Sequence, residues 1–110
     1  MKTVKEVSAL TGISVRTVHH YDAIGLLHPT TVTKAGYRLY DDAALHRLYL
    51  ILCYREIGFP LKQIRQLLDA PDEERNRILQ QQMELLRKKV THLENQIAFA
   101  TGIKLIGVNH

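Results

Sequence analysis

The apolar residues of the first 25 positions recur at intervals of three and four, the pattern of two short amphipathic helices. Thr3 and Glu6 form a capping box at the start of the first helix, and Gly12 supplies the left-handed residue that ends it. Ser14 is the N-cap of the second helix, which ends before Gly25. Two short helices joined by a tight turn that contains glycine predict a helix-turn-helix.

Residues 26–40 interrupt this helical pattern and predict a β-hairpin. Pro29 stops helix formation, and the β-branched run at 30–33 favours an extended strand. A turn that contains glycine and a returning strand follow it. We expect this hairpin, or wing, to pack beside the helix pair with one of its two tyrosines, Tyr37 or Tyr40, buried against it.

Two more helices complete the predicted head. Asp41 or Asp42 caps a third helix that ends at Gly58. Pro60 opens a short fourth helix that finishes before Pro71. The head is therefore a winged helix-turn-helix of four helices and a small β-hairpin over residues 1–70.

From position 72 the apolar residues alternate in steps of four and three without a break, which predicts a long helix over 71–101. Such a helix is about 45 Å long, too long for the head to cover, so a second copy is the simplest cover. We expect a homodimer with a coiled-coil seam formed by Leu79, Met83, Leu86, Val90, Leu93, Ile97 and Ala100. The charges flanking the seam favour antiparallel pairing. A long helix lying across its own domain is the alternative.

The predicted fold is thus mainly α, a winged helix-turn-helix head followed by a long dimerisation helix that forms an antiparallel coiled coil. Residues 102–110 are expected to be a tail or the start of a linker to an absent effector domain.

Charge and composition narrow the class of protein. The chain has 110 residues and a formal net charge of +4. Most of the basic excess lies in residues 1–40, which contain five lysines and arginines but only two acidic residues. No run approaches the roughly 18 apolar residues of a membrane span, nothing near Met1 resembles a signal peptide, and the single Cys53 excludes an internal disulfide. We expect a cytoplasmic protein without membrane attachment.

The second predicted helix carries the side chains that a DNA-reading helix needs. Arginine binds phosphate or guanine, threonine contacts a thymine methyl, and histidine and tyrosine reach phosphates and base edges. A solvated helix face without function is the alternative, and the basic excess favours double-stranded DNA as the partner. The candidate DNA-binding residues here are Ser14, Arg16, Thr17, His19, His20 and Tyr21 on the helix and Lys34, Tyr37 and Arg38 on the wing.

Metal binding and catalysis find little support in the sequence. The side chains of His19 and His20 point about 100° apart on a helix, so they do not readily bind one ion. His19 and Asp22 together supply only two ligands, and Cys53 reads as a small core residue. No glycine-rich phosphate loop or supported nucleophile–base pair exists. We expect no enzyme, no metal and no cofactor.

The ordered set of these motifs resembles the MerR-type transcription regulators. The similar segments are 3–7, 12–22, 24–29, the wing at 35–40 and the second wing region at 57–68. The forms His-His-Tyr-Asp at 19–22 and Arg-Leu-Tyr at 38–40 are most similar to the TipA-like and Mta-like drug-responsive branch of that family.

This resemblance implies a function beyond DNA binding. Such regulators are homodimers that bend and untwist an over-long promoter spacer, and so activate RNA polymerase indirectly, through the shape of the DNA. It also implies that Arg55 makes an additional backbone contact, and the lack of further cysteines speaks against metal sensing. The chain is expected to be either a fragment of a longer regulator or a natural short form. The alternative is a DNA-binding or coiled-coil interaction module that acts as a scaffold or antagonist without remodelling promoters.

Overall fold

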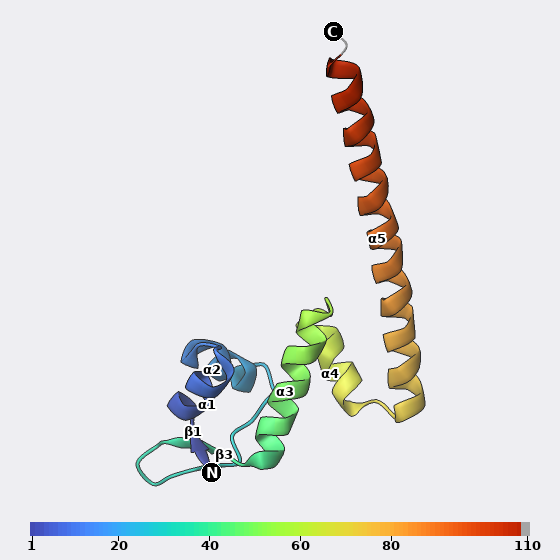
Figure 1. Ribbon diagram of the computed structural model, residues 1–110. Helices are drawn as coiled ribbons and strands as arrows, with labels where there is room; N and C mark the ends of the chain where they lie inside the picture. Colours follow the sequence, from blue (N-terminus) through green and yellow to red (C-terminus); the bar gives the residue numbers. More distant parts are fainter. Residues whose placement is uncertain (109–110) are drawn as a thin grey trace. The chain divides into compact units, whose positions relative to one another are not determined.

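The computed structural model describes residues 1–108 and divides into two compact units between Asp69 and Ala70. The second unit contains a single long helix, α5 (Asp72–Val108). The elements of the first unit, shown in Figure 1, are β1 (Lys2–Thr3), α1 (Val4–Thr11), α2 (Val15–Ala23), β2 (Thr31–Val32), β3 (Arg38–Tyr40), α3 (Asp42–Glu56) and α4 (Leu61–Asp69).

The helix pair α1–α2 forms where the capping pattern predicts it. The hydroxyl of Thr3 accepts from the backbone N–H of Glu6 at 3.2 Å, and the Glu6 carboxylate accepts from the N–H of Thr3 at 3.0 Å. Gly12 ends α1 with a φ of 78°. Ser14 then caps α2 by accepting from the N–H of Thr17 at 3.0 Å. The predicted helix-turn-helix is confirmed.

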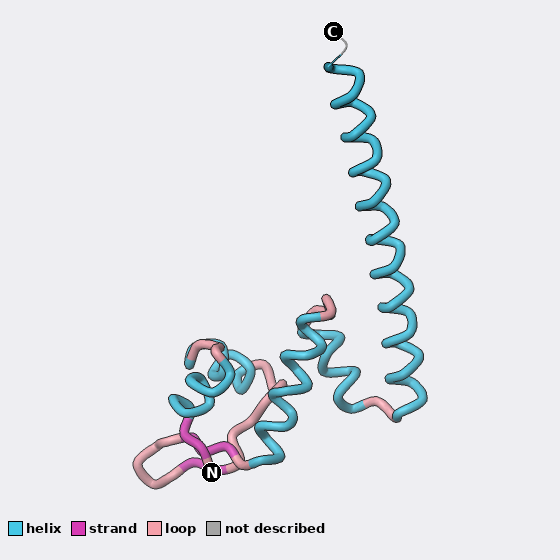
Figure 2. The backbone as a smooth tube through the Cα atoms, in the orientation of Figure 1, coloured by secondary structure: helices cyan, strands magenta, loops and turns pink. Residues whose placement is uncertain are grey.

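The wing belongs to a three-stranded antiparallel sheet in the order β1–β3–β2, drawn in magenta in Figure 2. In the predicted hairpin, Thr31 of β2 pairs with Leu39 of β3. On the other side of β3, Thr3 of β1 pairs with the same residue, Leu39. The strand β1 was not predicted, because two residues are too few to show an alternating pattern. Tyr40 is buried and Tyr37 is exposed, so the expectation that one of them packs is confirmed.

Helices α3 and α4 also follow the prediction. Of the two candidate caps, Asp41 is the N-cap of α3, and its carboxylate accepts from the N–H of Ala44 at 2.9 Å. Gly58 follows α3 with a φ of 98°. The carbonyl of Pro60 accepts from the N–H of Ile64 at 3.1 Å, which begins α4.

The core of the first unit draws on all four of its helices. Full burial of one large apolar side chain contributes about 1.5–3 kcal/mol, so this core is the main source of stability for the head. Its most deeply buried side chains are Val7, Val18, Tyr21, Leu26, Leu27, Tyr40, Leu48, Ile51, Ile64 and Leu67.

The helix α5 is longer than the sequence predicted. Residues 102–110 were expected to be a tail or the start of a linker, outside the helix, but the helix continues unbroken to Val108, and only residues 109–110 lie outside the described part of the chain. Gly102 and Gly107 lie inside the helix, and neither has a positive φ. Each glycine costs the helix only about 1 kcal/mol relative to alanine, too little to end it there. Ile103 and Leu105 lie between them and favour the helix more than glycine does. Of the helices that the structure describes, none combines the length and apolar character of a membrane span.

Candidate nucleic-acid interface

Helix α2 buries one face and presents polar side chains on the others. Val18 and Tyr21 lie three positions apart on the inward face and are completely buried. The hydroxyls of Ser14 and Thr17 lie 2.9 Å apart at the exposed start of the helix. The polar residues of the helix body that reach the surface are Arg16, Thr17, His19, His20 and Asp22, of which Arg16 and His20 are exposed and the others half-buried.

Tyr21 belongs to the core and not to the surface on which the sequence analysis placed it. Its side chain is 0% exposed, and its hydroxyl accepts a hydrogen bond from Nη1 of Arg55 at 2.8 Å. This bond joins α2 to α3 across a separation of 34 residues. Tyr21 is spaced three residues after Val18, and that helical spacing was the available signal for its burial. Tyr21 therefore supports α2 from inside the head.

The wing exposes its basic and aromatic residues at and near its tip. Lys34 lies in the turn, and Tyr37 is 68% exposed. Gly36 has a φ of 88°, and its N–H donates to the carbonyl of Thr33 at 2.9 Å, which closes the turn. Arg38 follows at the start of β3 and is half-buried. These side chains lie on the same unit as the exposed face of α2.

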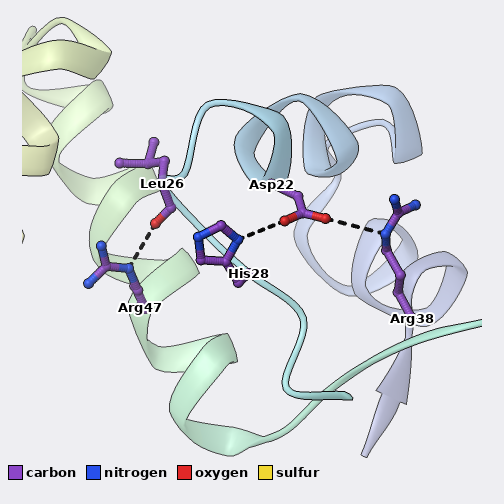
Figure 3. Close-up of polar contacts among 5 residues, drawn as sticks. All are labelled: Asp22, Leu26, His28, Arg38 and Arg47. Carbon is purple, nitrogen blue, oxygen red and sulfur yellow. Dashed lines mark hydrogen bonds and ion pairs between the residues drawn. The ribbon is translucent and has the colours of Figure 1, made fainter. Parts of the chain in front are cut away.

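A cluster centred on Asp22 links α2 to the wing (Figure 3). One carboxylate oxygen of Asp22 lies 2.7 Å from Nδ1 of His28, in the loop after α2. The other oxygen lies 3.3 Å from Nε of Arg38 on β3. The sequence analysis considers Asp22 as a metal ligand with His19 and as part of the family-like segment 19–22, and does not relate it to His28 or Arg38. It missed this cluster because the partners lie 6 and 16 positions away with no periodicity to relate them.

Arginines from α3 and α4 hold the loop that follows α2. Nε of Arg47 donates to the carbonyl of Leu26 at 2.8 Å, as Figure 3 shows, and Arg47 also forms an ion pair with Asp69 at 3.7 Å. The guanidinium of Arg65 lies against Gly25, where an added Cβ would be 3.0 Å from Nη2. Arg55 and Arg65 thus contact α2 or the loop after it, in addition to Arg47.

Two acidic groups at helix starts have lowered pKa values. The backbone N–H of Ala44 and then the hydroxyl of Thr30 lower the pKa of Asp41. Hydrogen bonds from the backbone and side chain of Thr3 lower the pKa of Glu6.

Burial raises the pKa of Tyr40, whose hydroxyl has no hydrogen-bond partner among the described residues. Within that same part of the chain, no three His, Cys, Asp or Glu side chains gather as a metal site.

Comparison with protein families and known proteins identifies relatives of this chain. The family described as "MerR HTH family regulatory protein" matches residues 2–71, and the family "MerR, DNA binding" matches residues 45–104. The chain is 50% identical over 94 residues to the HTH-type transcriptional activator mta of Bacillus subtilis, covering 86% of this chain and 37% of that protein. It is 46% identical over 110 residues to the HTH-type transcriptional activator TipA of Streptomyces coelicolor, covering 97% of this chain and 44% of that protein.

The chain therefore spans less than half the length of either of these curated relatives. A solved structure shares its fold closely, the N-terminus of the Bacillus subtilis multidrug transporter activator, MtaN. The TM-score is 0.79 and the identity 48%, and the match covers 88% of this chain and 92% of that one. The resemblance to the Mta-like and TipA-like branch is confirmed, and the chain belongs to the family of MerR HTH regulatory proteins.

Proposed function

We propose that this chain binds promoter DNA sequence-specifically and acts as the DNA-binding part of a transcription activator. The observation that carries the proposal is the exposed polar face of α2, set behind a capped first helix and beside a basic wing. The two curated relatives named above are both HTH-type transcriptional activators, which supports activation as the outcome of binding. Promoter binding would place the protein with the chromosome, in the cytoplasm.

In this proposal α2 enters the major groove and the wing contacts the flanking backbone. Arg16, Thr17, His19 and His20 read base edges, and Ser14 accompanies them at the helix start. Lys34, Tyr37 and Arg38 bind phosphates, which fix the register of the head on the duplex. Arg55 is exposed apart from its bond to Tyr21 and is proposed as an additional backbone contact.

We further propose that α5 joins two copies in an antiparallel coiled coil. Most of its seam positions are open to solvent in the single chain, with Val90 52% and Ile97 66% exposed, whereas Leu79 and Leu86 are half-buried. An apolar stripe of this length stabilises the protein only when it is buried against another surface. A twofold dimer buries it against the same stripe of a second copy, which is the simplest arrangement. The seam consists of Leu79, Met83, Leu86, Val90, Leu93, Ile97 and Ala100. The first unit then serves as the DNA-binding head and α5 as the dimerisation helix.

Two heads on one dimer can activate a promoter by changing the shape of the DNA. Bending a site of 20–30 base pairs costs about 1–6 kcal/mol, which phosphate contacts from both heads can offset. Bending and untwisting an over-long spacer would bring the two promoter elements into the alignment that RNA polymerase requires. The polymerase is then an indirect partner, reached through the DNA.

The test uses an operator selected from a pool of random duplexes, with binding measured by fluorescence anisotropy. Arg16→Ala removes a donor of the reading face and should weaken operator binding by about 1–3 kcal/mol, roughly 5- to 150-fold. Lys88→Ala removes an exposed positive charge from α5, outside the first unit and off the proposed seam, and is the matched control that should bind normally. An Arg16→Ala variant with unchanged affinity would contradict the proposed reading face.

Salt dependence and transcription separate the proposal from a passive module. If each protomer neutralises about four phosphates, the logarithm of the binding constant should fall with the logarithm of salt at a slope near −7 for the dimer. A slope near zero would exclude the phosphate contacts. Operator binding that leaves transcription by purified RNA polymerase unchanged would favour a scaffold or antagonist instead of an activator.

A further inference from the structure

We propose that Asp22 is a positioning residue for DNA recognition, which holds Arg38 of the wing in a fixed place beside α2. The inference rests on the proposed function, because it concerns how the reading surface is assembled. Asp22 is not proposed to touch DNA. Its effect would be exerted through Arg38 and, secondarily, through His28.

The geometry joins three segments that are separate in the sequence. Asp22 lies in the last turn of α2, His28 lies in the loop before β2, and Arg38 begins β3. The two carboxylate oxygens are divided between the partners, at 2.7 Å from His28 Nδ1 and 3.3 Å from Arg38 Nε. The Asp22 side chain is 22% exposed and that of Arg38 is 40% exposed, so the carboxylate is the more enclosed of the two. Asp22 therefore connects the wing, through Arg38, to α2, the helix proposed to contact the bases.

The pairing leaves Arg38 able to bind a phosphate. Arginine carries five N–H donors, one on Nε and four on the terminal nitrogens, and the ion pair with Asp22 engages Nε. Among the described residues the Arg38 side chain forms no other hydrogen bond or ion pair, and Figure 3 draws no interaction at its terminal nitrogens. A guanidinium held by one edge presents its other edge in a fixed orientation, which suits bidentate recognition of phosphate.

The position of Asp22 on this surface calls for such a role. An unpaired carboxylate close to a proposed DNA contact would repel the phosphates that Lys34 and Arg38 attract. An ion pair as exposed as this one contributes little to the stability of the fold. Its value would lie in pre-organisation, because a long side chain that is already ordered loses less freedom when it binds.

A double-mutant cycle on the full chain tests the inference. The variants are Asp22→Ala, Arg38→Ala and their combination, each titrated against the selected operator and against a scrambled duplex of equal length. Asp22→Ala should weaken operator binding about three- to tenfold by releasing the Arg38 side chain. Binding to the scrambled duplex should stay equal or tighten, since one negative charge is lost. The ratio of the two affinities should therefore fall.

The two substitutions should also be non-additive. In the Arg38→Ala background, Asp22→Ala should produce no further loss, because the group that it positions is absent. Asp22→Asn retains one accepting oxygen and nearly the same shape, so it should give an intermediate loss and carries the test if Asp22→Ala does not fold. Asp42→Asn removes an acidic charge from an exposed position in the first turn of α3 and is the matched control that should bind normally.

The possible results discriminate between the two proposals. Additive losses, or an Asp22→Ala variant whose ratio of operator to scrambled affinity is unchanged, would overturn the positioning role while the proposed function stands. A lower thermal midpoint with normal affinities at low temperature would assign Asp22 a structural role only and would also overturn it. An unsubstituted chain that prefers no sequence would contradict the proposed function itself and, with it, this inference.

Discussion

Gly25, directly after α2 and its C-cap residue, is a residue whose replacement should be costly for two separate reasons. Its φ of 74° is a left-handed angle that costs other residues about 1–2 kcal/mol, and a Cβ there would meet Nη2 of Arg65 at 3.0 Å. Gly12 has nearly the same φ, 78°, with no atom within 4 Å of the added Cβ. Chemical denaturation should therefore show Gly25→Ala to be destabilised by about 1–2 kcal/mol or more, and by more than Gly12→Ala. Equal losses in the two variants would mean that Arg65 moves aside freely.

Asp41 should give the stability of the head a dependence on acid pH. The N–H of Ala44 lowers the pKa of Asp41 in the folded state below its value in the unfolded chain. Its charged form therefore stabilises the fold fully above the unfolded pKa of about 4, and this contribution is lost as the pH falls through the folded pKa. Asn at the same position can cap the helix without a charge, so Asp41→Asn should lose less stability on acidification. Thermal midpoints of both proteins between pH 7 and about 3 measure this, and a constant difference across that range would contradict it.

The residues that the sequence predicted correctly are those whose partners are close along the chain. Thr3, Ser14 and Asp41 bond to backbone groups three positions away. The local pattern of residue types therefore identified the first two caps and narrowed the third to Asp41 or Asp42. Tyr21 and Asp22 have partners 34 and 16 positions away. Only the packing of α3 and the wing against α2 brings those partners together. Such contacts leave no periodic signal in a single sequence.

At the scale of the element, α5 should respond to glycine replacement as a helix and not as a tail. Gly102 has no atom within 4 Å of an added Cβ, and its φ is not positive. Gly102→Ala should therefore raise the helix content measured by circular dichroism and stabilise α5 by up to about 1 kcal/mol. Gly107→Ala has the same open surroundings and provides a second measurement near the helix end. Unchanged helicity in both variants would favour the tail that the sequence predicted.

The glycines explain why element boundaries were predicted well in the head and poorly in α5. Gly12, Gly25 and Gly58 follow helices in the head and adopt φ values of 78°, 74° and 98°. The same residue type inside α5 stays helical, because apolar neighbours continue the helix past it. Glycine permits a helix end without requiring one, so its presence in the sequence does not decide between the two outcomes.

At the scale of the whole molecule, the proposed dimer makes DNA binding depend on α5. Val90 lies at the centre of the proposed seam and is 52% exposed in the single chain. Val90→Lys places a charge in an apolar interface and should convert dimers to monomers in sedimentation velocity at micromolar concentration. A monomer carries one head and half the phosphate contacts, so the salt slope of DNA binding should fall from about −7 towards half that value.

Lys88→Ala is the control for this variant, because Lys88 lies on the same helix at an exposed position outside the seam. It should remain dimeric and bind the operator normally, whereas Val90→Lys should bind with the affinity of a single head. All the proposed DNA-contacting residues lie on the first unit, which has its own hydrophobic core. The first unit of the monomer should therefore keep its fold and its preference among half-site sequences. An undisturbed dimer in Val90→Lys would refute the seam. A monomer that still binds the full operator with unchanged affinity and salt slope would show that one head suffices, and α5 would then have a role other than pairing two heads on DNA.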